Sequence, residues 1–340
     1  YRTKAPSGRC RCAPANYVTK IIIINDNLMS RILKVAAAQL GPIALAEPRS
    51  SAVGRMIALM QNAKAQDAEL VVFPELALTT FFPRWYTEEQ SEIDKYFETE
   101  MPNKATQPLF DEARKLKIGF NFGFAELVVE DGVTRHFNTA VIVNNQGEIA
   151  AKYRKIHLPG HTENEPWRAF QHLEKRYFEK GNLGFQVHPL FGGKIGMCIC
   201  NDRRWPETFR VMGLQGVELV ALGYNTPKHY PQAPEHDHLQ EFHNHLVLQA
   251  AAYQNGTWIV GVAKAGKEED CDLIGGTCII APTGEIVAEC KTLADEVILA
   301  ECDLERCKEI QENIFNFNLH RQPEDYALIT AAKKESHSNH

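Results

Sequence analysis

The 340-residue sequence lacks most of the motifs that identify nucleotide-binding, zinc-ribbon and membrane proteins. It has no Walker A motif, no GxGxxG after a strand and no GxSxG elbow, so nucleotide binding and serine hydrolysis are unsupported. It has no CxxC pair, which argues against a zinc ribbon or a thioredoxin-type site. No stretch approaches the roughly 18 uninterrupted apolar residues of a membrane span. We therefore expect no membrane partner.

The sequence also has no excess of positive charge. The chain has 37 Lys and Arg against 43 Asp and Glu, a net charge of -6, which argues against nucleic acid as the main partner. Residues 1–28 contain five of the basic residues and one acid, which leaves 32 basic and 42 acidic side chains, or -10, for residues 29–340. The apolar run 21–24 in this basic segment is shorter than the roughly 7 to 15 residues of a signal peptide. We interpret residues 1–28 as a leader or appended segment, with an extra strand over 21–24 as the alternative.

Seven of the nine cysteines lie after this segment. An odd number of cysteines without a recognisable export signal is typical of free thiols in a reducing compartment. We therefore expect a cytoplasmic protein.

Short apolar segments alternate with helical patterns, and the whole pattern occurs twice. The first half has expected strands at 32–39, 69–73, 119–129, 137–143 and 148–153 and helices at 50–66 and 107–117. The second half has expected strands at 194–199, 217–222, 258–262, 273–281, 285–289 and 297–301 and helices at 205–214 and 239–254. Two halves that each run β-α-β and then into hairpins predict one α/β domain over residues 29–330 with internal pseudo-symmetry, followed by an exposed tail over 331–340.

Reactive side chains follow directly after three of these strands. Glu75 comes after a strand stopped by Pro74, beside large apolar residues, where partial desolvation suits a general base. Lys155 and His157 stand just before the turn Pro159-Gly160, which could point both side chains inward. For Glu75 the alternative is an ion-paired or helix-capping glutamate. For the Lys155 and His157 segment the alternative is a basic strand edge exposed to solvent.

Cys200 ends the third strand, just before a helix that begins near Pro206. Positive backbone dipoles and two nearby arginines should favour its thiolate form. Strand alternation places Cys198 on the same face but deeper, so we assign Cys198 to the core. An inert buried thiol is the alternative for Cys200.

Four histidines, His236, His238, His243 and His245, fall at the spacing of one helix face. No HExxH motif and no paired-carboxylate pattern completes a ligand set. The sequence therefore predicts no metal site.

In chain order, Glu75, Lys155 and Cys200 match the Glu-Lys-Cys triad of the nitrilase superfamily. Within it the chain most resembles the N-carbamoyl-D-amino acid amidohydrolases, or D-carbamoylases. The resemblance extends over roughly residues 32–330 and rests on the stretches FPELALTTFFPRW, RKIHLPGH, FQHLEKRYFE, ICNDRRWPE, YNTP and IFNFNLHRQP. Residues 1–28 match nothing in the family pattern.

This resemblance implies a four-layer αββα sandwich and a thiol hydrolase without cofactor or metal. It assigns Glu75 as the base, Cys200 as the nucleophile that attacks a carbamoyl carbon, and Lys155 with the backbone N–H of Asn201 as the oxyanion donors. The expected partner is a small molecule, an N-carbamoyl-D-amino acid, hydrolysed to the D-amino acid, carbon dioxide and ammonia. The family also implies a homodimer or homotetramer.

The expected substrate contacts come from two sources. Arg203 and Arg204 stand where guanidinium groups can bind the substrate's α-carboxylate. Carried over from the family, Glu174 holds the ureido nitrogen. The other expected contacts form a polar pocket of His157, His172, Asn201, Asn225 and Thr226. For Arg204 and Thr226, a salt bridge or a turn contact is an equal alternative.

Three other interpretations stay open. Another nitrilase-superfamily reaction, that of an aliphatic amidase, a nitrilase or a β-ureido acid hydrolase, is the nearest of them. The others are a non-catalytic binding or scaffold protein of the same fold and a histidine-based metallohydrolase. The paired arginines favour a substrate with a carboxylate, and the three occupied triad positions favour an enzyme.

Overall fold

The computed structural model describes residues 30–168, 170–231 and 233–331. The expected leader, residues 1–28, lies outside the described residues, and so does the expected tail except for residue 331. No helix in the described part of the chain is long and apolar enough to cross a membrane.

Two six-stranded mixed sheets form the centre of the molecule. In spatial order the first sheet contains β14 (Glu296–Asp303), β1 (Ile32–Gln39), β2 (Leu70–Val72), β3 (Gly119–Glu130), β4 (Val133–Val143) and β5 (Ile149–Arg154). The second contains β13 (Ile286–Glu289), β12 (Cys278–Ile280), β9 (Trp258–Ala263), β8 (Leu219–Tyr224), β7 (Gly193–Ile199) and β6 (Val187–Leu190). A separate two-stranded ribbon joins β10 (Ala265–Glu268) to β11 (Cys271–Ile274).

The two large sheets repeat one topology. In the first, β1, β2 and β3 are parallel, and β4 and β5 continue the sheet antiparallel. In the second, β7, β8 and β9 are parallel, and β12 and β13 continue it antiparallel. Each sheet also has an added antiparallel edge strand, β14 against β1 and β6 against β7. The expected internal pseudo-symmetry is therefore present.

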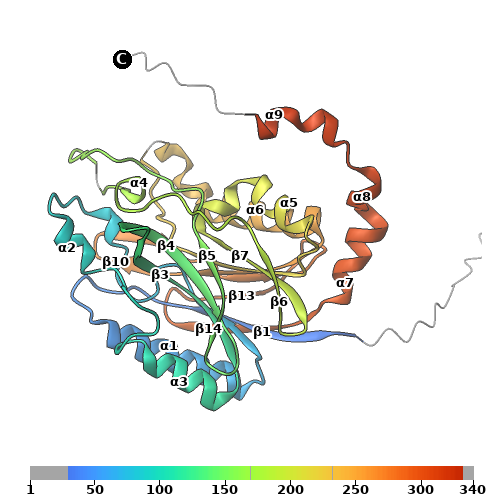
Figure 1. The fold of residues 1–340 in the computed structure, drawn as a ribbon, viewed down its shortest axis with the longest axis horizontal. Coiled ribbons are helices and arrows are strands. Elements are labelled where there is room, and N and C mark those ends of the chain that lie inside the picture. The colour runs from blue at the N-terminus through green and yellow to red at the C-terminus, as the bar shows by residue number, and fades with distance from the viewer. Residues whose placement is uncertain (1–29, 169, 232, 332–340) are drawn as a thin grey trace, which may run out of the picture.

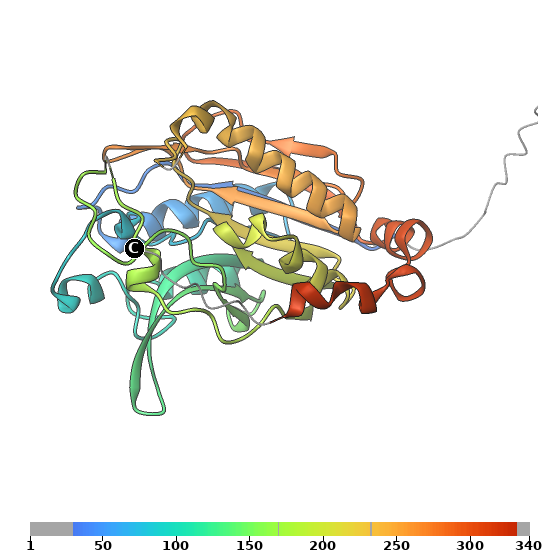
Figure 2. The same cartoon turned by 90° about the horizontal axis from the view of Figure 1, so that it is seen from above.

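Helices cover the outer faces of both sheets, which gives the expected four-layer αββα sandwich (Figures 1 and 2). Helices α1 (Arg49–Ala65) and α3 (Gln107–Leu116) lie on the first sheet, and α5 (Pro206–Gly213) and α6 (Gln240–Asn255) lie on the second. The shorter helices are α2 (Gln90–Asp94), α4 (Glu174–Tyr177), α7 (Glu305–Lys308), α8 (Phe317–His320) and α9 (Ala327–Thr330).

Side-chain alternation explains how one strand serves two layers. On β1, Val35 and Ala37 belong to the core that joins the two sheets, whereas Ala36 and Ala38 belong to the core under α1 and α3. Successive strand residues point to opposite faces, so a nearly continuous apolar run is what a doubly covered strand requires. Buried residues of α1 such as Met56 and Met60 recur at helical spacing and complete that outer core.

The expected single strand over 273–281 is wrong. The chain forms β11 and then β12, and Gly275 and Gly276 between them have φ of 66° and 72°. This left-handed backbone favours glycine and interrupts a strand.

Candidate active site

Glu75 follows β2 on a segment held between two strands of different sheets. A Cβ built at Gly223 of β8 would lie 2.4 Å from the backbone nitrogen of Glu75, and one at Gly123 of β3 would lie 2.8 Å from its Cα. Only glycine allows backbones to approach this closely. The two glycines therefore let Glu75 pass between the sheets, where its side chain is buried.

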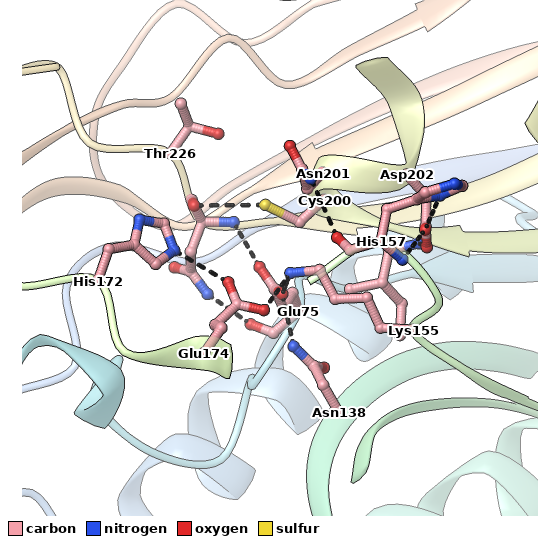
Figure 3. A network of polar contacts seen from close by, with 12 residues as sticks. Glu75, Asn138, Lys155, His157, His172, Glu174, Cys200, Asn201, Asp202 and Thr226 are labelled. Carbon is pink, nitrogen blue, oxygen red and sulfur yellow. Dashed lines mark hydrogen bonds and ion pairs between the residues drawn. The ribbon is translucent and has the colours of Figure 1, made fainter. Parts of the chain in front are cut away.

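Both oxygens of the Glu75 carboxylate accept hydrogen bonds (Figure 3). Oε1 accepts from Nζ of Lys155 and from Nδ2 of Asn138, each at 2.7 Å. Oε2 accepts from the backbone N–H of Asn225 at 3.0 Å. Asn138 comes from β4, and Asn225 follows β8, so donors from both sheets fix the orientation of the carboxylate.

Lys155 lies fully buried directly after β5, between two carboxylates. Its Nζ donates to Glu75 at 2.7 Å and to Oε2 of Glu174 at 2.5 Å. Burial acts to lower the pKa of Lys155, but the charge that Cys200 carries when it is ionised and the charges of Glu174 and Glu75 outweigh burial and raise it. The lysine is therefore a fixed cation at neutral pH.

Glu174 begins α4 and is completely buried. Besides Lys155 it faces His172, whose Nε2 lies 3.0 Å from Oε1. Burial acts to raise the pKa of Glu174, but the charge of Lys155 and the His172 contact lower it below its ordinary value. Glu174 is thus a second buried carboxylate beside the lysine.

Cys200 sits at the sharp turn between β7 and a short 3-10 segment, Cys200–Arg204. Its φ is 46°, a left-handed conformation that is uncommon for a side chain other than glycine and typical of strained functional turns. The thiol lies 3.5 Å from the backbone carbonyl of Asn225, whose own N–H binds Glu75. The Asn225 backbone therefore connects the cysteine to the carboxylate.

The expectation of a favoured Cys200 thiolate is wrong for the free protein. Burial raises the pKa of the thiol, and the neighbouring Glu75 charge raises it further. Lys155 and Arg203 act in the opposite direction without reversing the shift. Because the turn is buried, desolvation outweighs the helix and arginine effects that the local sequence suggested. The resting form is the protonated thiol.

The structure adds to the site a completely buried acid, Asp202, that the sequence did not predict. Its carboxylate accepts hydrogen bonds from Tyr153 Oη at 2.7 Å and from the backbone N–H groups of His157 and Ile199 at 2.9 and 3.0 Å. Its Oδ1 also lies 2.8 Å from Nδ1 of His157. Asp202 therefore joins the Lys155 segment to the Cys200 turn.

This arrangement places His157 apart from the other expected contacts. Its ring stacks on Trp205, with ring centroids 4.9 Å apart, and faces Asp202. His157 is not among the residues that line the cavity beside Cys200. In the structure it supports the cysteine turn, and only its backbone carbonyl contacts an expected site residue, by accepting from Nδ2 of Asn201 at 3.0 Å.

A cavity of about 280 Å³ opens next to Cys200. The expected residues among its lining are His172, Cys200, Asn201, Arg203, Arg204, Asn225 and Thr226. Glu75, Lys155 and Glu174 form the buried cluster behind it (Figure 3). The structure thus brings together every expected site residue except the His157 side chain.

The cavity lining is strongly cationic. Among the described residues that line it are Arg168, Lys175, Arg203 and Arg204, and no Asp or Glu. Arg168 pairs with Glu165, but no acidic partner is recorded for Arg204 or Lys175 within the described ranges, and both side chains are exposed.

Arg203 differs from Arg204 because it is buried and already engaged. It donates to Oδ1 of Asn244 at 2.9 Å, to the Cys200 carbonyl at 2.7 Å and to Oγ1 of Thr226 at 2.8 Å. Its guanidinium also lies 4.5 Å from the ring centre of Tyr224. Arg203 and Thr226 therefore hold the cysteine turn, whereas Arg204 is free to meet a ligand.

Two contributors to the site, Asn138 and Asp202, were missed from the sequence. Asp202 lies within the stretch ICNDRRWPE, and an acid two residues after a candidate nucleophile was a usable signal. Asn138 lies within an expected strand, and only the pairing of β4 with its neighbours turns it toward Glu75.

The four-layer sandwich of two six-stranded mixed sheets therefore holds a buried cluster of a cysteine, a lysine and a glutamate that each follow a strand, with a second glutamate at the start of α4. The profile of the family described as "Carbon-nitrogen hydrolase" matches residues 34–312. The chain belongs to this family, part of the nitrilase superfamily.

Several curated proteins are similar over most of their length. A nitrilase of Pyrococcus abyssi is 30% identical over 295 residues, covering 87% of this chain and 99% of the relative. An N-carbamoylputrescine amidase of Arabidopsis thaliana is 28% identical, covering 80% and 87%. A citrullinase of Francisella tularensis is 27% identical, covering 87% and 98%. The crystal structure of a carbon-nitrogen hydrolase from Helicobacter pylori superposes with a TM-score of 0.75 at 22% identity, covering 89% of this chain and all of that one.

Proposed function

We propose that this protein hydrolyses N-carbamoyl-D-amino acids to the D-amino acid, carbon dioxide and ammonia through a thioester on Cys200. The observation that supports the substrate class is the cavity beside Cys200, lined by four basic side chains, of which only Arg168 has an acidic partner, and by no Asp or Glu among the described residues. The D configuration rests on the resemblance of the sequence stretches to D-carbamoylases.

The charge of the cavity separates this proposal from the activities named for the relatives. N-carbamoylputrescine has a primary amine that is protonated at neutral pH. Lys175 and Arg204, which have no acidic partner within the described ranges, would repel that ammonium, because like charges brought together are unfavourable. An α-carboxylate on the same carbamoyl group would instead be attracted, and Arg204, exposed and without an acidic partner in the described ranges, can bind it in a bidentate way.

The first half-reaction begins at the thiol. Glu75 takes the proton from Cys200, and the sulfur attacks the carbamoyl carbon. The developing oxyanion is stabilised by the Lys155 ammonium and the backbone N–H of Asn201. Burial and the Glu75 charge raise the pKa of Cys200, so the reaction needs Glu75 to accept the thiol proton.

Glu75 then gives its proton to the departing nitrogen, and the C–N bond breaks to leave a thioester on Cys200. Water activated by Glu75 attacks this thioester, which releases the thiol and a carbamic acid. The carbamic acid decomposes, so that one water in total is consumed and the amino acid, ammonia and carbon dioxide are formed. Either nitrogen can leave first in this scheme.

The remaining side chains divide into two groups. Glu174, held by Lys155, and His172 are proposed to bind the ureido nitrogen, with the Asn225 amide completing the polar pocket. Arg204 supplies the main contact to the α-carboxylate, and the one N–H of Arg203 without a partner among the described residues adds to it. Thr226 acts through Arg203.

The reaction is tested by separate alanine substitutions of two cysteines, Cys200 directly after β7 and Cys198 within β7. Cys200→Ala should abolish ammonia release without loss of the folded state. Cys198→Ala, which removes a buried core thiol from the same strand, should keep most of the activity. Full activity in Cys200→Ala would disprove the mechanism and would favour the metallohydrolase alternative, and an inactive wild type would favour the scaffold alternative.

The substrate is tested by an ammonia-release assay on matched compounds. N-carbamoyl-D-amino acids with apolar, aromatic and polar side chains are compared with their L enantiomers, with N-carbamoylputrescine, with simple amides and with a nitrile. Turnover of the D series alone supports the proposal. Preference for N-carbamoylputrescine or for an uncharged amide would overturn the substrate class while leaving the Cys200 chemistry intact.

We also propose a homodimer or homotetramer in a reducing compartment. The outer face of α5 and α6 exposes the apolar side chains of Val211, Leu214, Phe242, Leu246 and Tyr253, more than isolated surface apolar residues would explain. The seven described cysteines are all free thiols. Light scattering coupled to gel filtration checks the assembly, and a monomeric mass would contradict it.

A further inference from the structure

The histidine-rich segment of the sequence separates into two groups in the structure. His236 and His243 face each other, with ring centroids 6.3 Å apart. His245, two residues later on α6, lies instead against the edge strand β13, where its Nε2 is 3.7 Å from Oε1 of Glu289 and 3.3 Å from the Gly276 carbonyl. His245 therefore meets a carboxylate that comes 44 residues later in the chain.

Glu241 completes a cluster with these two residues. It lies four residues before His245 on α6, so both side chains share one helix face. One ligand atom from each of Glu241, His245 and Glu289 lies within 4.8 Å of the others. Glu289 also contacts Lys291, whereas Glu241 has no hydrogen bond or ion pair recorded within the described part of the chain.

We propose that Glu241, His245 and Glu289 bind a divalent transition-metal ion of the Zn²⁺ type. One imidazole nitrogen and two carboxylate oxygens form a ligand set suited to Zn²⁺ or Co²⁺, with a fourth position left for water. Ligands of a tetrahedral ion with bonds of about 2.1 Å lie about 3.4 Å apart. The exposed Glu241 and half-buried Glu289 can close the remaining distance by rotation of their side chains. Within the described residues, Glu241 and Glu289 share only one cationic side chain, Lys291, besides His245, and two carboxylates held close together favour a cation between them.

This ion is separate from the proposed reaction, because Glu241, His245 and Glu289 do not line the cavity beside Cys200. The ion would join α6 to β13 and stabilise the folded state, since a ligand that binds only the folded state adds to its stability. The sequence did not reveal the site because Glu289 stands on a strand far from the histidines.

The experiment uses the full chain with Cys200→Ala, which removes the reactive thiol as a competing ligand. Co²⁺ and Zn²⁺ are titrated by calorimetry and by the visible absorption of Co²⁺, with Mg²⁺ as the hard-cation comparison. We expect one tight equivalent of Zn²⁺ or Co²⁺, a higher melting temperature and no comparable Mg²⁺ effect. Glu241→Gln, an exposed change that leaves packing intact, and His245→Ala should each weaken binding at least tenfold.

Two matched variants decide whether the site is the proposed one. His243→Ala removes another histidine of the same helix and should leave binding unchanged. Cys290→Ser removes the thiol next to Glu289 and should also leave it unchanged. Undiminished binding in Glu241→Gln and His245→Ala, or loss of binding in His243→Ala or Cys290→Ser, would overturn the proposal.

Discussion

Replacement of Gly223 by alanine tests whether the position of Glu75 depends on the close approach of two backbones. The new Cβ would lie 2.4 Å from the Glu75 nitrogen and 2.6 Å from the Pro74 carbonyl carbon. Non-bonded heavy atoms need about 3.5 Å, so the Glu75 backbone must move by roughly 1 Å. A misplacement of that size costs about 100-fold in rate, and overpacking costs about 1–3 kcal/mol of stability.

The matched control is Gly54→Ala. A Cβ at Gly54 meets no atom within 4 Å, and the position is exposed on α1. Alanine there should stabilise the protein by about 0.5–1 kcal/mol through helix propensity and leave the rate unchanged. Both variants are assayed for ammonia release under steady-state conditions and for thermal unfolding, with near-UV circular dichroism to verify the fold. Wild-type kcat/KM in Gly223→Ala would refute the reasoning.

Three further predictions concern the charges. Glu174→Gln should lower kcat/KM about 10²–10³-fold, as loss of a preorganised polar contact does, and steady-state assays showing under a tenfold change would contradict its role. Burial and Glu75 raise the pKa of Cys200 above the ordinary value for a thiol. Its alkylation by iodoacetamide, followed on the Cys200 peptide by mass spectrometry, should therefore still accelerate at alkaline pH, where a free thiol, with a pKa of about 8.5, is already ionised. A plateau below about pH 7 would count against this prediction. Burial acts to raise the pKa of Glu126, but Arg154 and Lys152 lower it below its ordinary value. Ionised Glu126 therefore stabilises the folded protein above the pKa of the unfolded state, near 4.5, and this stabilisation is lost as the pH falls through the lower pKa of the folded state. Glu126→Gln should therefore flatten the acid limb of melting temperature against pH, unlike the exposed control Glu88→Gln.

The layered fold could be predicted because its strands are covered on both faces. β1 and α1 agree with the expected 32–39 and 50–66 almost to the residue, since a buried strand and an amphipathic helix have different apolar periods. The sequence did not predict β6 or β10. Pro189 interrupts the pattern of β6, and β10, Ala265–Glu268, is short and largely polar. Pairing with neighbours rather than local composition creates these two strands.

The site could be predicted where the signal was local. Glu75, Lys155 and Cys200 each follow a strand and meet in space. The contributions of Asn138 and Asp202 depend on which strands lie side by side, and the resting state of Cys200 depends on burial. Neither tertiary pairing nor burial is visible in a short stretch of sequence. The cavity charge likewise emerges only when Arg168 and Lys175, in and just after the loop before α4, converge with Arg204 of the segment that follows β7.

The most direct test of the account is the mass of the protein during turnover. Enzyme in excess over an N-carbamoyl-D-amino acid is quenched rapidly in acid, and intact protein and its peptides are measured by mass spectrometry. The account predicts a transient adduct on the Cys200 peptide, absent from Cys200→Ala and gone once the substrate is consumed. The adduct mass also reveals whether ammonia or the amino acid leaves first. Ammonia release with Cys200 unmodified at every quench time, or with the adduct on another residue, would contradict the thioester mechanism.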